Sequence, residues 1–443
     1  MNGPRLRIGF VTHEYPPFFG GGIGTYVEQI SRAFAQSGHE VHIFTIRRPD
    51  DPTTIDASGV HVHRAPFDPP EPLARGLIGR FAEAGTWIHL ASIMRRQLRE
   101  FLQRGELDIV EIPECLATGW MALGDPALRV PTVVNLHTPD YVVAALNHSD
   151  TPAWKHLERL PIEAADGVCA PSRAMIDHLA DDVHRGDVEV VPHPYDADGF
   201  IQGYTPPIGD EILFVGRLEH RKGVVTLIQA AKAMLALDAN VVFTLIGRDT
   251  NTAPGGGSMR DYLQGLLTDH ERRRVRFLDA IPRHELAESY RRASFCVFPS
   301  LFENFPNVCL EAMSAGRPVI ATYGTGMVEM LGETGVFVEP DDPADLAEAM
   351  LRLRRNHRLR DTLAALTYLR VRDRYTPARA AQWRLEYYRR VIDQCGGVSD
   401  LAQRTARVHP QTWRTAAPSL AALIHSMHAN SAAGSPSTSE ATP

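Results

Sequence analysis

Residues 7–46 read RIGFVTHEYPPFFGGGIGTYVEQISRAFAQSGHEVHIFTI, and this stretch sets the fold. Arg7–Thr12 is a short apolar, β-rich run, and a Pro/Gly loop follows over Tyr15–Gly24. Residues 25–37 then show apolar side chains at helical spacing before a second strand-like run, Glu40–Ile46. Strand, loop, helix and strand in this order form a βαβ unit, which predicts a parallel sheet covered on both faces.

The same alternation continues through the first half of the chain. Further strand-like runs, separated by helical stretches, lie at 109–112, 131–136, 167–170 and 188–191. We therefore expect residues 1–204 to form one doubly wound, Rossmann-like domain.

A second series begins after residues 196–210, a stretch rich in Gly, Pro, Asp and Tyr that we interpret as a linker. Its strand-like runs lie at 211–215, 241–246, 275–277, 295–298, 319–321 and 336–338. This predicts a second Rossmann-like domain over 205–376, with ligands bound between the two domains at the carboxyl ends of the strands. An amphipathic helix follows over 377–395, and we expect the tail, 396–443, to be partly disordered because it becomes low-complexity from Ser431.

Composition excludes several classes of protein. A chain of 443 residues favours two or three domains, and its 44% hydrophobic and 22% charged residues are typical of globular proteins. The net charge of −7 argues against a nucleic-acid binder. The five cysteines lie far apart, as in reduced cores, and neither a signal peptide nor a spanning segment is visible, so we expect a cytoplasmic protein.

Two loops carry groups that suit phosphate. In the first domain, Gly20–Gly24 precedes a helix whose N-terminus offers free N–H groups to an anion, although the pattern is not GxGxxG and a plain turn is an alternative. In the second, Arg217 follows a strand and Lys222 opens a helix, so both cations can converge on one diphosphate unless they form a solvated turn. Lys222 is also one of only three lysines among 46 basic residues.

The segment PSLFENFPNVCLEAM, residues 299–313, is the sharpest signal. It follows a strand and enters a helix near Pro306, which places Glu303 in the loop and Glu311 inside the helix. A carboxylate among apolar neighbours is costly unless it meets hydrogen-bond donors, and ribose hydroxyls would supply them.

Together, YPPFFGGGIGTYV, VGRLEHRKG and PSLFENFPNVCLEAMSAGRPVIA resemble the retaining glycosyltransferases of family 4, in register over roughly 5–393. The resemblance implies the α/β GT-B fold: two Rossmann-like domains facing across a cleft, with the helix at 377–395 crossing back to the first domain. It also implies that Arg217 and Lys222 bind the donor diphosphate. It places Gly21 and Gly22 opposite the phosphates and Glu311 in contact with the ribose. It places Glu303 and His137 beside the donor sugar, and it implies that Asn304, Phe305 and Leu310 also bind the donor.

The activity implied is transfer of a hexosyl group from a UDP- or GDP-linked donor to a glycan, lipid-linked or small-molecule acceptor, with retention. Neither a metal nor a cofactor is expected. No residue is assigned as a nucleophile, so we favour a front-face mechanism in which the departing phosphate oxygen takes the acceptor proton. The alternatives are a nucleotide-sugar epimerase of the same fold and a non-catalytic sugar-nucleotide-binding assembly protein.

Two departures from the family pattern concern loops. His193-Pro194 stands where Asn-Gly is usual after the last strand of the first domain, and Asp279 stands where glycine is usual after the Val275–Leu278 run. The first affects the geometry of the linker on the acceptor side, and the second affects the loop near the base.

Three further motifs have a plainer interpretation. Asp196-Ala197-Asp198 spells the metal-binding DxD, but its place in the linker favours a turn. His61 and His63 lack a third ligand and indicate an exposed edge strand. The arginine-rich helix at 73–104 packs on the first domain and lines the acceptor side, or alternatively contacts an anionic membrane at the inner face of the plasma membrane.

Overall fold

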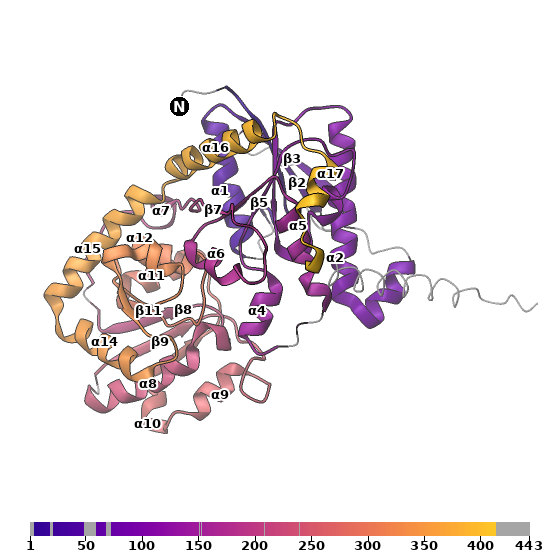
Figure 1. Cartoon of the computed structure of the whole chain (residues 1–443). Helices are drawn as coiled ribbons and strands as arrows, with labels where there is room; N and C mark the ends of the chain where they lie inside the picture. Colours follow the sequence, from indigo (N-terminus) through magenta and orange to yellow (C-terminus); the bar gives the residue numbers. More distant parts are fainter. Residues whose placement is uncertain are drawn as a thin grey trace, which may run out of the picture.

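The computed structural model describes residues 4–17, 21–47, 59–67, 72–149, 151, 153–207, 209–238 and 240–412, without the side chains of 72–84, 153 and 154. They form two parallel sheets (Figure 1). The first has the order β3-β2-β1-β4-β5-β6-β7 and the second β10-β9-β8-β11-β12-β13. Each sheet carries helices on both faces, so the predicted pair of doubly wound domains is confirmed.

The strands lie close to the apolar runs in the sequence. In the first sheet they are β1 (Arg7–Val11), β2 (Glu40–Arg47), β3 (Val60–Pro66), β4 (Ile109–Pro113), β5 (Thr132–Asn135), β6 (Gly167–Ala170) and β7 (Glu189–Val190). In the second they are β8 (Glu211–Val215), β9 (Val242–Ile246), β10 (Val275–Leu278), β11 (Ala293–Phe298), β12 (Val319–Thr322) and β13 (Val336–Val338).

Helices connect the strands. Those of the first domain are α1 (Gly22–Gln36), α2 (Pro72–Leu102), α3 (Trp120–Leu123), α4 (Asp140–Leu146), α5 (Arg159–Ala164) and α6 (Arg173–Leu179). Those that follow are α7 (Ala197–Phe200), α8 (Val224–Leu237), α9 (Met259–Gly265), α10 (Asp269–Arg272), α11 (Arg283–Arg292), α12 (Asn307–Ser314), α13 (Met327–Leu331), α14 (Pro343–Arg355), α15 (His357–Arg374), α16 (Pro377–Gln394) and α17 (Leu401–Arg407). None of the described helices is long and apolar enough to cross a membrane.

Side chains along β1 point alternately to the two faces of the first sheet and contribute to two separate cores. Ile8 and Phe10 of β1 pack with α1 and α16, whereas Val11 belongs to the core on the opposite face, with α2. Because both faces are covered, β1 and its neighbours are continuous apolar runs rather than alternating ones.

The stretch expected to be a linker contains ordered structure. Ala197 and Ile201 of this stretch are buried in the core of the second domain with Tyr195, which directly precedes it and whose N–H donates to the Tyr375 carbonyl at 2.6 Å. The Asp196 carboxylate accepts a hydrogen bond from the Gly199 N–H and caps α7. The DxD sequence thus serves as a helix cap in this structure.

β3 forms an edge of the first sheet, and three histidines gather there. The ring of His42 lies 5.0 Å from that of His61 and 5.3 Å from that of His63, and His63 also stacks on Phe44. His61 is exposed, whereas His63 is half-buried. Within the described residues no group of three histidine, cysteine or acidic side chains is arranged to hold a metal ion.

α2 packs on the first domain through its described side chains. Trp87, Leu90, Met94 and Leu98 are buried, and Arg95 and Arg99 pair with Asp125. From residue 85 onward the apolar face of this helix is therefore covered by protein.

α16 leaves the second domain and crosses back along α1 of the first (Figure 1). Arg384 of this helix is fully buried and its Nη1 lies 3.0 Å from Glu111 Oε2 of β4. The Glu111 carboxylate also accepts hydrogen bonds of 2.6 Å from the hydroxyls of Tyr26 and Tyr388. One buried charge network thus ties the C-terminal helix to the first sheet.

We expect Arg384→Met to lower the free energy of unfolding by about 3–5 kcal/mol, because it leaves the Glu111 carboxylate buried without its counter-charge. Urea-induced unfolding measures the change. The matched control is Arg390→Met on the same helix, which removes a half-exposed pair with Glu189 and should cost less than about 1 kcal/mol. Equal effects of the two substitutions would contradict this role of Arg384.

Candidate functional site

The carboxyl edge of the second sheet holds most of the predicted donor-binding residues. Arg217 and Lys222 follow β8, Glu303 lies in the loop between β11 and α12, and Glu311 lies within α12. β8 and β11 are neighbours in the sheet, so their carboxyl ends bring these loops together.

Lys222 and Glu303 form the centre of this edge. The Lys222 ammonium pairs with Glu303 Oε1, and both side chains are largely buried. Arg221 Nη1 lies 3.4 Å from Glu303 Oε2, and the Ser300 hydroxyl donates to Oε1 at 3.1 Å. The structure thus brings together the two predicted residues Lys222 and Glu303 and adds Arg221 and Ser300.

Arg221 is buried by further contacts. It donates to the Phe302 carbonyl at 3.0 Å and to Glu219 at 2.7 Å. Arg221 was not predicted from the sequence because, in EHRKG, an arginine beside Lys222 looks like part of a solvated turn. Its position between two acidic residues at 219 and 303 becomes visible only in three dimensions.

The charges of this cluster control its protonation. Burial raises the pKa of Glu303. The positive charges of Lys222 and Arg221, together with hydrogen bonds from Lys222 and Ser300, outweigh this effect and lower the pKa of Glu303 to about 2. Burial lowers the pKa of Lys222, and the nearby Glu303 charge partly offsets that effect. Glu303 therefore remains a carboxylate at neutral pH and holds the Lys222 side chain in place.

Arg217 differs from Arg221 in exposure. Its side chain is 44% exposed and its Nη2 lies 3.2 Å from Glu219 Oε1. The guanidinium is held loosely on one side and remains open to solvent on the other. This leaves it free to pair with an added anion.

Glu311 is half-buried in α12 and accepts a hydrogen bond of 3.0 Å from the Tyr290 hydroxyl. The pKa of Glu311 is raised by burial. The hydrogen bond from Tyr290 and the positive charge of Arg283 offset part of this increase. Its neighbour Leu310 is fully buried in the core of the second domain, so its side chain stabilises the domain and any ligand would meet its backbone. Phe305 packs edge-on against the rings of His193 and Tyr375.

The glycine loop of the first domain faces the start of α12. Gly21 precedes α1 and Gly22 is its first residue, and Gly20 lies outside the described residues. A Cβ on Gly22 would lie 3.9 Å from Nδ2 of Asn307, the first residue of α12. Two helix N-termini, one from each domain, therefore approach each other at this point.

His137 lies in the loop after β5. Its backbone N–H donates to both oxygens of the buried Glu114 at 2.8 and 2.9 Å, and the Thr138 N–H donates to Glu114 at 2.7 Å. Its ring nitrogen Nε2 lies 3.2 Å from Asn135 Nδ2. Burial, with the charges of Arg384 and His13, lowers the pKa of His137 to about 3, so the imidazole is neutral at physiological pH.

His193, where the family pattern has Asn-Gly, supports this loop. It is buried, its ring centroid lies 4.2 Å from that of Tyr26, and its Nε2 lies 3.1 Å from Asn135 Nδ2. The substitution thus fills the space behind His137. The other departure, Asp279, is exposed and pairs with Arg260 at 2.7 Å.

Asn304 joins the two domains. Its Nδ2 donates to the carbonyls of Leu136 and His137 at 3.0 and 2.7 Å, and its Oδ1 accepts a hydrogen bond of 2.8 Å from the Ser172 hydroxyl. The side chain is buried and its polar atoms are engaged by the first domain. In this arrangement the side chain of Asn304 is engaged between the two domains and does not serve the donor-binding role expected of it.

Comparisons with known proteins agree with this arrangement. Residues 20–198 match the family described as Glycosyltransferase Family 4, and residues 209–356 match Glycosyl transferases group 1. Glycogen synthase from Mycobacterium tuberculosis is 30% identical over 372 residues, which cover 78% of this chain and 85% of that protein.

Two solved structures share the fold. Sucrose-phosphate synthase from Thermosynechococcus elongatus superposes with a TM-score of 0.69 at 24% identity, covering 88% of this chain and all of that one. HepE from Anabaena, solved in complex with UDP and glucose, gives a TM-score of 0.63 at 17% identity over 87% of this chain and all of that one. With both halves matched in order, the chain belongs to the group 1 glycosyltransferases of family 4 and is a glycosyltransferase of the GT-B fold that uses nucleotide-sugar donors.

Proposed function

We propose that the enzyme transfers a hexosyl group from a UDP- or GDP-linked sugar to its acceptor with retention of anomeric configuration. The observation that carries this proposal is the buried Lys222–Glu303 pair at the carboxyl edge of the second sheet, with the open Arg217 guanidinium on the same edge. HepE, which has the same fold, binds UDP and glucose, and this supports a nucleotide diphosphate as the donor group here.

Lys222 and Arg217 would bind the diphosphate. A guanidinium and an ammonium together supply the two positive charges that a divalent cation supplies in other enzymes, so the proposed reaction uses neither a metal nor a cofactor. The N-termini of α1 and α12 add backbone N–H groups and the positive ends of two helix dipoles. Glu311 would accept hydrogen bonds from the ribose hydroxyls.

The surroundings of Glu303 favour a front-face mechanism. Retention by double displacement needs a free nucleophilic carboxylate about 5 Å from a partner acid. Glu303 Oε1 is bound by Lys222 and Ser300, Oε2 faces Arg221, and a pKa of about 2 makes the group a weak base. It is therefore suited to holding the ammonium and the sugar in place, and poorly suited to attacking carbon.

In the proposed step, the bond between the anomeric carbon and the diphosphate oxygen breaks while the acceptor oxygen bonds to that carbon from the same face. The acceptor proton passes to the departing phosphate oxygen. Negative charge then grows on the diphosphate, where Lys222 and Arg217 stabilise it more strongly than in the ground state. His137, neutral at physiological pH, would hydrogen-bond the sugar without adding charge.

The acceptor would bind on the side of the first domain, where Asn304 holds the loop of His137. Closure of the two domains excludes water, which would otherwise compete with the acceptor. The proposed acceptor is a glycan, a lipid-linked molecule or a small molecule. If the acceptor is lipid-linked, the helix at 73–104 would bind peripherally to an anionic membrane and bring the enzyme to it.

We expect Lys222→Met to lower kcat by about 100- to 1,000-fold, because the leaving diphosphate loses its nearest cation. Release of nucleoside diphosphate from a panel of UDP- and GDP-hexoses measures this rate. Lys232→Met is the matched control, since Lys232 donates to the Leu266 carbonyl of the second domain and should retain full activity.

A folded Lys222→Met protein with a near-normal rate would contradict the proposed role of this lysine. The same panel separates the alternatives. An isomerised donor without nucleotide release would indicate an epimerase, and no turnover with any donor by the unmodified protein would indicate a binding protein.

We expect Asn304→Ala to open the two domains, because it removes three hydrogen bonds worth about 1 kcal/mol each from their interface. Small-angle X-ray scattering should show a larger radius of gyration, and kcat should fall. Asn240→Ala, at an exposed position, is the control and should change neither quantity. An unchanged radius of gyration for Asn304→Ala would show that other contacts hold the domains together.

A further inference from the structure

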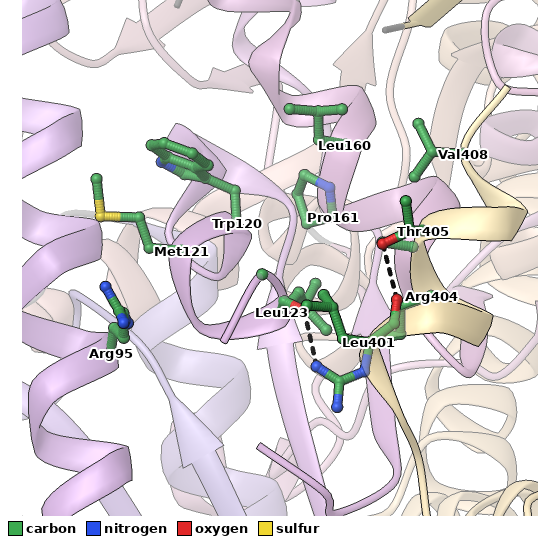
Figure 2. A pocket seen from close by; sticks show the side chains of 12 residues that line it. Arg95, Trp120, Met121, Leu123, Leu160, Pro161, Leu401, Arg404, Thr405 and Val408 are labelled. Atoms are coloured by element: carbon green, nitrogen blue, oxygen red, sulfur yellow. Dashed lines mark hydrogen bonds between the residues drawn. The ribbon is translucent and has the colours of Figure 1, made fainter. Parts of the chain in front are cut away.

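A groove of about 420 Å³ lies on the first domain and shares no residue with the candidate site. Figure 2 shows its walls, which come from α3, α5 and the segment around α17. The apolar lining residues are Trp120, Met121, Leu123, Leu160, Pro161, Ala164, Leu401 and Val408. This volume falls within the range of sites that bury a ligand or several side chains.

The polar side chains of the groove are already engaged. Arg404 donates to Ser399 at 3.0 Å and to the carbonyls of Leu123, at 2.7 Å, and Leu128. The Thr405 hydroxyl donates to the Leu401 carbonyl at 2.7 Å, and Arg95 pairs with Asp125 at 2.7 Å. Figure 2 draws the Arg404–Leu123 and Thr405–Leu401 bonds. The groove therefore suits an apolar occupant rather than a sugar or a phosphate.

The described chain ends at a wall of this groove. The His409 N–H donates to Glu163 Oε2 at 2.8 Å, and the Thr412 hydroxyl donates to Glu163 Oε1 at 2.7 Å. Glu163 belongs to α5 and precedes Ala164, which lines the groove. The segment 413–443 therefore starts next to the groove.

The sequence that follows has the pattern of an amphipathic helix. Leu420, Leu423, Ile424 and Met427 are spaced i, i+3, i+4 and i+7, and Pro418 stands where a helix would begin. Arg414 and Glu440 are the only charged residues of 413–443, with histidine counted as neutral. The six Cα–Cα steps from Thr412 to Pro418 span up to about 20 Å, which is ample to place this pattern over the groove.

We propose that residues 418–427 dock as a helix in the groove of their own chain, with Leu420, Leu423, Ile424 and Met427 against its apolar lining. Contiguous apolar surface on a monomer commonly marks an interaction site. Because the segment is tethered beside the groove, its effective concentration there is high and docking needs little intrinsic affinity.

Hydrogen exchange tests the proposal by comparing the full chain with a chain that ends at Thr412. Loss of the segment should raise amide exchange in α3 and α17 about tenfold or more, and leave α14 of the second domain unchanged. In the full chain, the double substitution Leu423→Asp and Ile424→Asp should reproduce this increase. Ala422→Asp with His425→Asp, on the opposite face of the same helical pattern, should retain the protection.

The other occupants are distinct outcomes. If the protection of α3 and α17 against amide exchange grows with protein concentration, the occupant of the groove is a second copy of the chain. Protection that appears only with vesicles of phosphatidylcholine and phosphatidylglycerol, in the full and the shortened chain alike, would assign it to a membrane. Either result, or equal exchange in all four proteins without vesicles, would overturn the proposal.

Discussion

The Lys222–Glu303 pair is the interaction on which the candidate site depends. An ammonium buried at the edge of a sheet is unfavourable without a counter-charge, and Glu303 supplies it. Arg221 in turn stabilises Glu303, and Glu219 stabilises Arg221. This chain of alternating charges keeps Lys222 in place without a ligand, so that binding of an anion requires little rearrangement of the protein.

The same loop also joins the two domains. Glu303 belongs to the charge cluster, and the next residue, Asn304, binds the backbone of the His137 loop. The carboxylate that pairs with Lys222 and the amide that binds the first domain thus belong to adjacent residues. Behind the His137 loop, Arg384 and Glu111 fix α16 to the first sheet and add a further connection between the domains.

Much of the fold could be predicted from the sequence because parallel strands that are buried on both faces are continuous apolar runs. The runs at 211–215 and 336–338 match β8 and β13 at both ends. β3 was missing from the series of apolar runs because VHVHRAP has the mixed pattern of a strand with only one neighbour, although His61 and His63 indicated an edge strand there. The glycine, proline and aspartate of 196–210 suggested only a linker, yet Ala197 and Ile201 there are core residues because their partners are distant in sequence.

For the site, local pattern identified residues but not all of their partners. Lys222 and Glu303 were named from their motifs, and the structure pairs them. Asn304 was expected to bind the donor, but its side chain meets carbonyls 167 and 168 residues away, a contact that no local spacing encodes. Glu114, which supports His137 from behind, was missed for the same reason, and His193 was noted only as a departure near the linker, without its contact to this loop.

The central claim is that this edge of the second sheet binds the diphosphate of a nucleotide. Isothermal titration of UDP and GDP, each beside its nucleoside, into the unmodified protein and into Arg217→Ala tests it most directly. The account predicts one-to-one binding of at least one diphosphate, much weaker binding of the nucleoside, and a loss of about tenfold or more in affinity for Arg217→Ala. Equal affinities for diphosphate and nucleoside, or for the two proteins, would contradict it.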